Sequence, residues 1–279
     1  MNAMATPSFC LDRSLGRSER QRPPSPYRLV DVMRSEWTKL TSVRSTRWTA
    51  VVLFVLTLGV GIAVDAVTGH DWATRSASSR ATFDATSASL SGLDFGSLAM
   101  GVLGVLVMSS EYATGLLRST LTAVPRRTFL LAAKAIVFGL AALFVGEVVT
   151  VVTFVSSDAT LGDAPHASLT DPTALRAVLQ SGAFLALVGL VGLALGTIVR
   201  HSAGAIAVLV GLVLVLPPVL HAVPGHLDRF TPETILSSAV AVTRTSPNEL
   251  SAWAGFALMA GYALVALFVG GIVLERRDA

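Results

Sequence analysis

Two carboxylates that lie in apolar stretches are the residues of this chain with the clearest capacity for chemistry. Glu147 lies deep in a long apolar run, and Asp65 lies near the end of another. Exposing an ionisable side chain to lipid costs about 3 kcal/mol or more, so such residues normally face a cavity, a partner or water. Glu147 is therefore a candidate for the substrate pathway, although a neutral glutamic acid with a structural role explains its position as well. For Asp65 we expect contact with water near a helix end.

A second group of residues has side chains that can bind a metal ion. His221, His226 and Asp228 lie close together in the sequence, but their spacing fits no recognised ligand motif. A solvated loop explains them, and no metal site is predicted. The single cysteine, Cys10, excludes an internal disulfide and a cluster of thiolate ligands within this chain.

Sequence patterns typical of enzymes do not occur in this chain. It contains neither His-Glu-x-x-His nor Gly-x-Ser-x-Gly, which removes the simplest arguments for a membrane-bound hydrolase. A phosphate-binding P-loop needs a glycine directly before its lysine, but Lys39 follows Thr38 and Lys134 follows Ala133. We therefore predict that the chain is not an enzyme and has no catalytic residue, no cofactor of its own and no nucleic acid partner.

The amino-acid composition predicts a membrane protein. Of 279 residues, 52% are hydrophobic and only 14% are charged, whereas soluble domains carry about 25% charged residues. Six apolar runs are each long enough to cross the hydrocarbon core of a bilayer. We predict an all-α membrane protein in which residues 28–279 form one transmembrane domain. The predicted spans are residues 48–67, 93–110, 130–155, 178–199, 203–220 and 252–274.

The distribution of positive charge predicts the orientation of these spans. Most of the 21 Lys and Arg residues lie in the N-terminal tail, the loop after residue 110 and the C-terminal end. Because positive residues near spans are retained in the cytoplasm, both termini are predicted to be cytoplasmic, in a multi-pass protein of the plasma membrane. Residues 1–27 are polar and rich in arginine and proline, so we predict a disordered cytoplasmic tail.

A short amphipathic helix is predicted before the first span. Leu29, Met33, Trp37 and Leu40 recur every three or four residues, with polar residues between them that include Glu36 and Lys39. Such a helix lies along the inner membrane surface. Its role is either to anchor the first span or to dock a partner, and the pattern is compatible with both.

The loop after the second span has a helical pattern of its own. Leu117, Leu121 and Val124 share one face, Thr114 is a candidate N-cap, and Pro125 favours an end before it. We predict a short cytoplasmic helix over residues 111–124, between spans 2 and 3. Its exposed leucines need a partner or the membrane face to cover them.

Small residues form a stripe along the fourth predicted span. Gly182, Ala186, Gly189 and Gly196 lie on one side, and Gly192 with Gly196 forms a Gly-x-x-x-Gly pair. This spacing permits close approach of another helix. We favour packing inside the chain over a seam between two copies.

The order and placement of several short motifs resemble those of ABC-2 type transporter permeases. The resemblance covers the chain from about residue 28 to the end. The motifs are Glu36-Trp37-Thr38-Lys39-Leu40, Glu111-Tyr112-Ala113-Thr114-Gly115, Pro125-Arg126-Arg127 and Arg276-Arg277-Asp278. The resemblance implies a connecting helix over residues 28–47, a coupling helix over residues 111–124, and short re-entrant helices in the 221–251 loop.

The same resemblance implies a function. The chain would be the permease subunit of an ATP-driven exporter that moves a hydrophobic or amphiphilic substrate outward, surrounded by membrane lipids. A separate ABC ATP-binding subunit would bind ATP and Mg, and two permeases, identical or homologous, would work with two ATPases. Gly115 lies two residues after Ala113 rather than four, which departs from the importer signature and favours export. The expected contacts with the ATPase are Glu111, Tyr112, Gly115, Leu117, Arg118 and Leu121, together with Met33, Glu36, Trp37 and Lys39 of the interfacial helix.

Two alternatives from other functional classes stay open. A stand-alone secondary transporter or channel would use Glu147 and Asp65 as proton or ion sites. A non-transporting membrane anchor would recruit a cytosolic partner through the 111–124 loop. An ion gradient that drives transport without nucleotide would distinguish the first of these from an ATP-driven exporter.

Overall fold

The regular structure of the described residues is entirely helical. A computed structural model describes residues 29–116, 127–157, 159–223, 227–242 and 250–276. The predicted tail, residues 1–27, lies outside them. The elements are α1 (Leu29–Ser42), α2 (Arg44–His70), η2 (Trp72–Thr74), α3 (Ala77–Ala81), α4 (Ala85–Ser89), α5 (Leu93–Thr114), α7 (Arg127–Ser157), α8 (Pro172–Val199), α9 (Ser202–Val210), η3 (Gly211–Val215), α10 (Leu216–His221), η4 (Leu227–Phe230), α11 (Pro232–Val240) and α12 (Ala252–Arg276).

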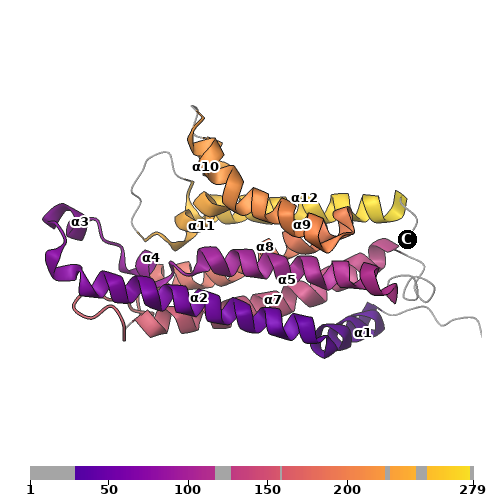
Figure 1. Cartoon of the computed structure of the whole chain (residues 1–279), viewed down its shortest axis with the longest axis horizontal. Helices are drawn as coiled ribbons and strands as arrows, with labels where there is room; N and C mark the ends of the chain where they lie inside the picture. The colour runs from indigo at the N-terminus through magenta and orange to yellow at the C-terminus, as the bar shows by residue number, and fades with distance from the viewer. Residues whose placement is uncertain (1–28, 117–126, 158, 224–226, 243–249, 277–279) are drawn as a thin grey trace, which may run out of the picture.

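Six helices are long and apolar enough to cross a membrane, and they coincide with the six predicted spans. These are α2, α5, α7, α8, the continuous run from α9 to α10, and α12. They lie side by side along the long axis of the molecule (Figure 1). The prediction of a helical chain with six helices long and apolar enough to span a membrane is therefore confirmed.

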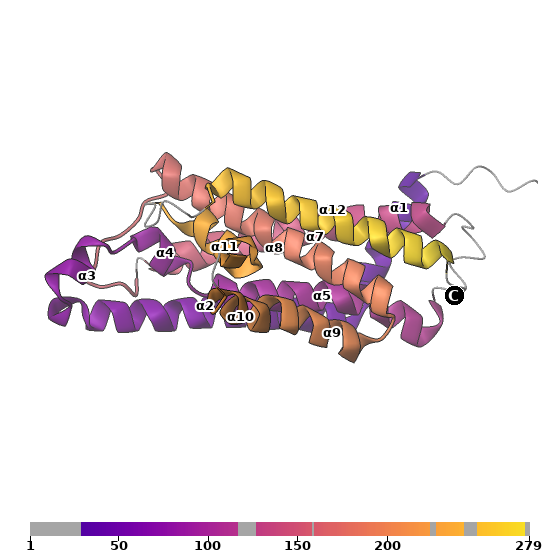
Figure 2. The ribbon, with the colours of Figure 1, turned by 90° about the horizontal axis from the view of Figure 1, so that it is seen from above.

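The two ends of this bundle differ in structure. Helix α1, the start of α7 and the end of α12 lie together at one end, which we call the α1 end (Figures 1 and 2). Helices α3, α4, α10 and α11 lie toward the opposite end, which we call the α11 end. The first and last described residues are thus at the same end of the molecule.

The fifth span ends at His221, within one residue of its predicted end at residue 220. Pro217 and Pro218 lie in its last turns without ending the helix before them. A proline lacks the N–H that would bond to the carbonyl four residues earlier. Those carbonyls belong to residues 213 and 214, which lie in the π-helical segment η3, where the backbone is already wound more widely. The helix therefore absorbs both prolines without breaking.

Helix α8 is the centre of the bundle, and its glycines bring two other helices close. A Cβ atom on Gly192 would lie 2.0 Å from the carbonyl oxygen of Gly101 in α5, and one on Gly104 would lie 2.0 Å from that of Gly189. A Cβ atom on Gly146 of α7 would lie 2.5 Å from the oxygen of Gly182. The small-residue stripe of the fourth span thus packs inside the chain, as we predicted.

Helix α1 forms where the sequence pattern places it, but only Met33 and Leu40 of the predicted apolar stripe pack against the core. Val32 and Glu36 are buried, whereas Trp37 is 52% exposed and Leu29 is also exposed. The helix packs mainly against α7, so its protein-facing side is rotated from the predicted apolar stripe. Its position at a membrane surface stays a prediction.

The region after the fifth span contains a short helix, as the sequence suggested. Helix α11 begins with Pro232, and the hydroxyl of Thr231 accepts a hydrogen bond from the amide of Thr234 at 3.4 Å. Helix α11 packs on α12 and α8. The side chains of His221 and Asp228 form a pair at 2.9 Å, and His226 lies outside the described residues. In the part of the chain that the structure describes, no three His, Cys, Asp or Glu residues gather as metal ligands would.

Candidate functional site

The last turn of α5 holds the first residues of the predicted coupling element. The sequence predicted a separate helix starting at Glu111, with Thr114 as its cap. Instead, α5 continues through Thr114, whose hydroxyl donates to the carbonyl of Ser110 at 2.8 Å. The helix ends at Gly115, which has a left-handed φ of 70°, a conformation that glycine adopts without steric cost. Glu111 and Tyr112 therefore belong to the second span.

The other predicted contacts of this segment, Leu117, Arg118 and Leu121, lie outside the described residues. The existence of a coupling helix over residues 111–124 therefore stays a prediction.

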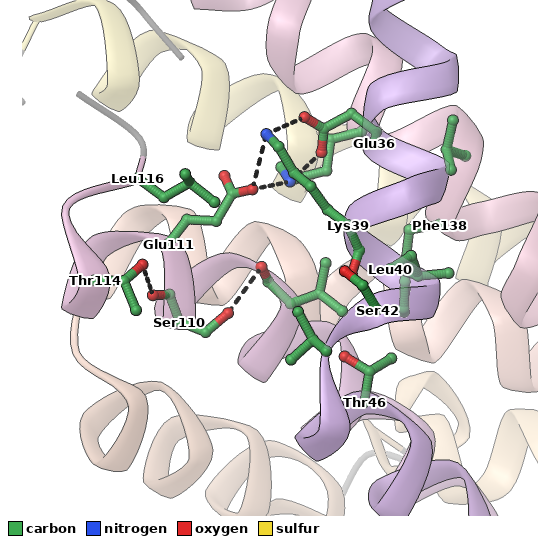
Figure 3. A pocket seen from close by; sticks show the side chains of 14 residues that line it. Glu36, Lys39, Leu40, Ser42, Thr46, Ser110, Glu111, Thr114, Leu116 and Phe138 are labelled. Carbon is green, nitrogen blue, oxygen red and sulfur yellow. Dashed lines mark hydrogen bonds and ion pairs between the residues drawn. The ribbon is translucent and has the colours of Figure 1, made fainter. Parts of the chain in front are cut away.

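Four charged side chains from three helices meet at the α1 end, and we call them the ion cluster. They are Glu36 and Lys39 of α1, Glu111 of α5 and Lys134 of α7 (Figure 3). The ammonium group of Lys134 donates to Glu111 Oε1 at 2.8 Å and to Glu36 Oε2. The ammonium group of Lys39 donates to Glu36 Oε1 at 2.6 Å and to Glu111 Oε1 at 3.3 Å. Each lysine thus contacts both glutamates.

Because the ion cluster is buried, each of its charges needs a close partner of opposite sign. Glu36, Glu111 and Lys134 are each at most 5% exposed. Removing charged groups from water costs several kcal/mol per ion, and attraction offsets this only when every charge has a close partner. Two carboxylates and two ammonium groups balance formally. The ion cluster is therefore stable only while α1, α5 and α7 keep their relative positions.

Sequence reasoning identified three members of the ion cluster but not their pairing. Glu36 and Lys39 were assigned to an interfacial helix, and Glu111 to a contact with a separate protein. Lys134 was considered only as a positive charge and as a residue without a P-loop glycine. Lys134 lies inside a predicted span, and a lysine there needs an anionic partner. This signal could have indicated its place in the ion cluster.

A second contact fixes the same turn of α5 from the other side. The hydroxyl of Tyr112 lies 3.5 Å from the carbonyl oxygen of Thr197 in α8. The guanidinium of Arg200, the residue that ends α8, lies 5.3 Å from the centre of the Tyr112 ring, which is within cation–π range. The last turn of α5 is thus attached to α1 and α7 through Glu111 and to α8 through Tyr112.

A cavity of about 350 Å³ lies beside the ion cluster. Polar atoms of the ion cluster and of Ser110 and Thr114 line one part, and apolar side chains such as Phe138 and Leu116 line the rest (Figure 3). Glu111 Oε2 is buried and has no hydrogen-bond partner among the described residues. The cavity has room for water molecules that would satisfy this oxygen, and its lining offers no arrangement typical of catalysis. The site therefore attaches α1, the end of α5 and the first turns of α7 to one another.

Comparisons with protein-family models and with curated proteins found no match. A functional assignment therefore depends on the residues and contacts themselves.

The ion cluster makes a specific prediction for the pH dependence of stability through Lys39. Burial alone lowers the pKa of Lys39, but the hydrogen bond to Glu36 and the attraction of both glutamates outweigh it, so the pKa is raised above its ordinary value of 10.5. A raised pKa stabilises the fold below the ordinary value, and this contribution is lost as the pH rises through the raised value. We expect a Lys39→Met variant to show a smaller loss of stability above about pH 10.5 than the unchanged protein. Unfolding temperatures measured from pH 7 to above that point test this, and identical alkaline profiles would contradict it.

Glu147 lies away from the ion cluster, against α8. It follows Lys134 by 13 residues in the same helix, which corresponds to about 20 Å at 1.5 Å per residue. A Cβ atom on Gly182 would lie 2.6 Å from its carboxyl carbon. Its Oε2 is buried without a hydrogen-bond partner. The glycine therefore provides the space that the carboxyl group occupies.

Asp65 contradicts our expectation that it meets water. It is fully buried, and neither carboxylate oxygen has a hydrogen-bond partner in the described part of the chain. The neighbouring helix turns explain its burial: a Cβ atom on Gly61 would lie 2.9 Å from Thr153 of α7, and one on Gly69 would lie 2.5 Å from the carbonyl oxygen of Leu161. Helix α7 and the turn after it therefore cover the end of α2.

Replacing Glu147 by Gln should leave the fold almost unchanged. The amide has nearly the same size, and the structure gives the carboxyl group no ion pair to lose. We expect a change in unfolding free energy within about 0.5 kcal/mol, measured by thermal unfolding in detergent. A loss well above this value would show that the carboxylate has a charged partner. If export by the variant is also unchanged, Glu147 has a structural role rather than a place in the pathway.

Proposed function

We propose that this chain is the membrane-spanning permease subunit of an ATP-driven exporter of the ABC-2 type, which moves a hydrophobic or amphiphilic substrate outward. The ion cluster carries this proposal. It joins α1 to the helix end from which the 115–126 loop departs. A chain driven by a separate ATPase needs a stiff connection at this point, whereas an ordinary loop between two spans needs none.

The arrangement supports a mechanical role for the α1 end. Closure of an ATPase pair on ATP would displace the end of α5 and α1 together, because Glu111 and Tyr112 attach the last turn of α5 on both sides. The tight glycine contacts between α5 and α8 would pass this displacement into the centre of the bundle. Rigid helices moved in this way open a pathway alternately to the two sides.

The proposed assembly contains separate permease and ATPase subunits. ATP and Mg would be bound by a partner ABC ATP-binding subunit, and two permeases, identical or homologous, would work with two ATPases. The excess of Lys and Arg on the segments at the α1 end supports its placement in the cytoplasm, with the protein in the plasma membrane. Leu117, Arg118 and Leu121 are the sequence-based candidates for contact with the ATPase.

Copurification with a coexpressed ABC ATP-binding subunit tests the proposal. Replacing Leu117 and Leu121 by Asp should abolish copurification and ATP-dependent export, because charges would replace the apolar contact. The matched control is Leu227→Asp, since Leu227 is an exposed leucine of η4, which packs against α10 and α11. Copurification and export that survive the double change would refute the assignment.

A stand-alone secondary transporter is the second candidate, and one observation favours it. Asp65 and Glu147 both have buried carboxylate oxygens without a partner among the described residues, and an ionisable residue inside a membrane span is a candidate proton or ion site. Purified protein in vesicles separates the two functions. Substrate movement driven by an ion gradient without nucleotide would support the carrier, and movement that needs the ATPase and ATP would support the permease.

A further inference from the structure

A groove of about 420 Å³ lies beneath α1, between α2 and α7. Trp37 and Leu40 of α1 cover it, Ala50 and Arg47 form the α2 wall, and α7 forms the other wall from Phe138 to Val145. Its size is in the range of ligand sites, about 300–1,000 Å³. The lining is almost entirely apolar, and Arg47 is its one charged member.

The residues around the groove place its mouth at headgroup level. Trp37 is 52% exposed, and Trp48, beside Arg47, is 69% exposed. Exposed tryptophans and arginines at the end of an apolar helix mark the membrane–water interface. Phe144 lines the groove deeper along α7 and is 71% exposed, so the groove continues into the depth of the acyl chains.

Among the described residues, the charge at the mouth of the groove is positive. The side chain of Arg47 is exposed and makes no hydrogen bond or ion pair with the described residues. Arg34 and Arg44 are exposed nearby in sequence, and Asp31 is the one exposed acid between residues 29 and 50. Glu36 cannot neutralise these cations, because it is buried in the ion cluster. The mouth therefore favours an anion.

We propose that this groove binds an anionic phospholipid. Arg47 holds the phosphate, since a guanidinium presents a planar pair of donors that match phosphate oxygens. One acyl chain lies along α7 past Phe138 and Phe144. A zwitterionic lipid fits less well, because its own ammonium group competes for the phosphate and adds to the positive charge at the mouth. The site is independent of the proposed export function.

Quenching of Trp37 fluorescence by brominated lipids tests this directly. The protein carries Trp37 as its single tryptophan, with Trp48, Trp72 and Trp253 replaced by Phe, in vesicles of phosphatidylcholine. Equal small fractions of brominated phosphatidylglycerol or brominated phosphatidylcholine are added. One phosphate-binding cation gives about a fivefold preference, so the anionic lipid should quench Trp37 with about fivefold higher relative affinity.

Variants separate a specific site from general surface charge. R47Q should remove the preference, and R47K should keep most of it. R44Q is the matched control, because Arg44 is exposed on the same helix and does not line the groove; it should keep the preference. A141F, which fills the groove, should reduce quenching by both lipids.

Three results would overturn the proposal. They are equal quenching by the two lipids, equal loss of preference in R44Q and R47Q, and unchanged quenching in A141F. The first two would show that the lipid responds only to diffuse charge, and the third would show that the groove holds no chain.

Discussion

Replacing Lys134 with methionine should lower the free energy of unfolding by about 3–5 kcal/mol, the cost of breaking a buried ion pair on one side. The change removes the cation that contacts both Glu36 and Glu111, which remain buried as carboxylates. Lys39 alone must then compensate two negative charges. The unfolding temperature of the purified protein in detergent, and its yield from membranes, measure this effect.

Two control variants distinguish the ion cluster from simple loss of packing. Lys39→Met should lower the free energy of unfolding by less than Lys134→Met, because the Lys39 side chain is 24% exposed and that of Lys134 only 4%. Water can therefore replace part of the interaction of Lys39 with the glutamates. The double variant Lys134→Met with Glu36→Gln restores charge balance and should be more stable than Lys134→Met alone. A Lys134→Met protein as stable as the unchanged chain, or a double variant no better than the single one, would contradict the described ion cluster.

Replacing Gly192 with alanine should separate α5 from α8. The added methyl group would lie 2.0 Å from the carbonyl oxygen of Gly101 and 3.1 Å from its Cα. These are backbone atoms, so no side chain can turn away, and the two helices must move apart along their whole contact. Overpacking a well-packed interior costs about 1–3 kcal/mol and occasionally more. We expect about 3 kcal/mol or more here, seen as loss of monodisperse protein in detergent.

The chain provides a matched control for this change. A Cβ atom on Gly59 or Gly261 would meet nothing within 4 Å, although both glycines lie inside spanning helices. Gly59→Ala and Gly261→Ala should therefore be neutral or stabilising by up to about 1 kcal/mol, through helix propensity alone. If Gly192→Ala behaves like these two, the close contact between α5 and α8 is wrong.

Features encoded in a continuous stretch of sequence were predictable. Each span is a long run with few charges, and each forms close to its predicted position. The start of α11 is likewise encoded locally, because Thr231 caps the helix and Pro232 is its first residue. The glycine stripe of α8 predicted close packing inside the chain, but its partner could not be named, because α5 carries its own glycines some 90 residues earlier.

The errors arose where tertiary contacts or competing local signals decide the outcome. Thr114 is a good N-cap residue, yet the glycine that follows it ends α5 and leaves Thr114 inside the last turn. Asp65 sits near a helix end, but the chain after α7 covers it. Glu36 and Lys134 are 98 residues apart, so no periodic pattern could reveal that they share a buried ion cluster.

Labelling of single cysteines in intact cells tests the proposed orientation, on which the whole account depends. The chain has one cysteine, so a Cys10→Ser background carries none. T114C places a thiol at the exposed end of α5 beside the ion cluster, and S79C places one on exposed α3 at the α11 end. An ATPase in the cytoplasm can act on the α1 end only if that end faces it. A membrane-impermeant maleimide should therefore label S79C in intact cells, and T114C only after the membrane is opened. Labelling of T114C from outside intact cells would contradict the account.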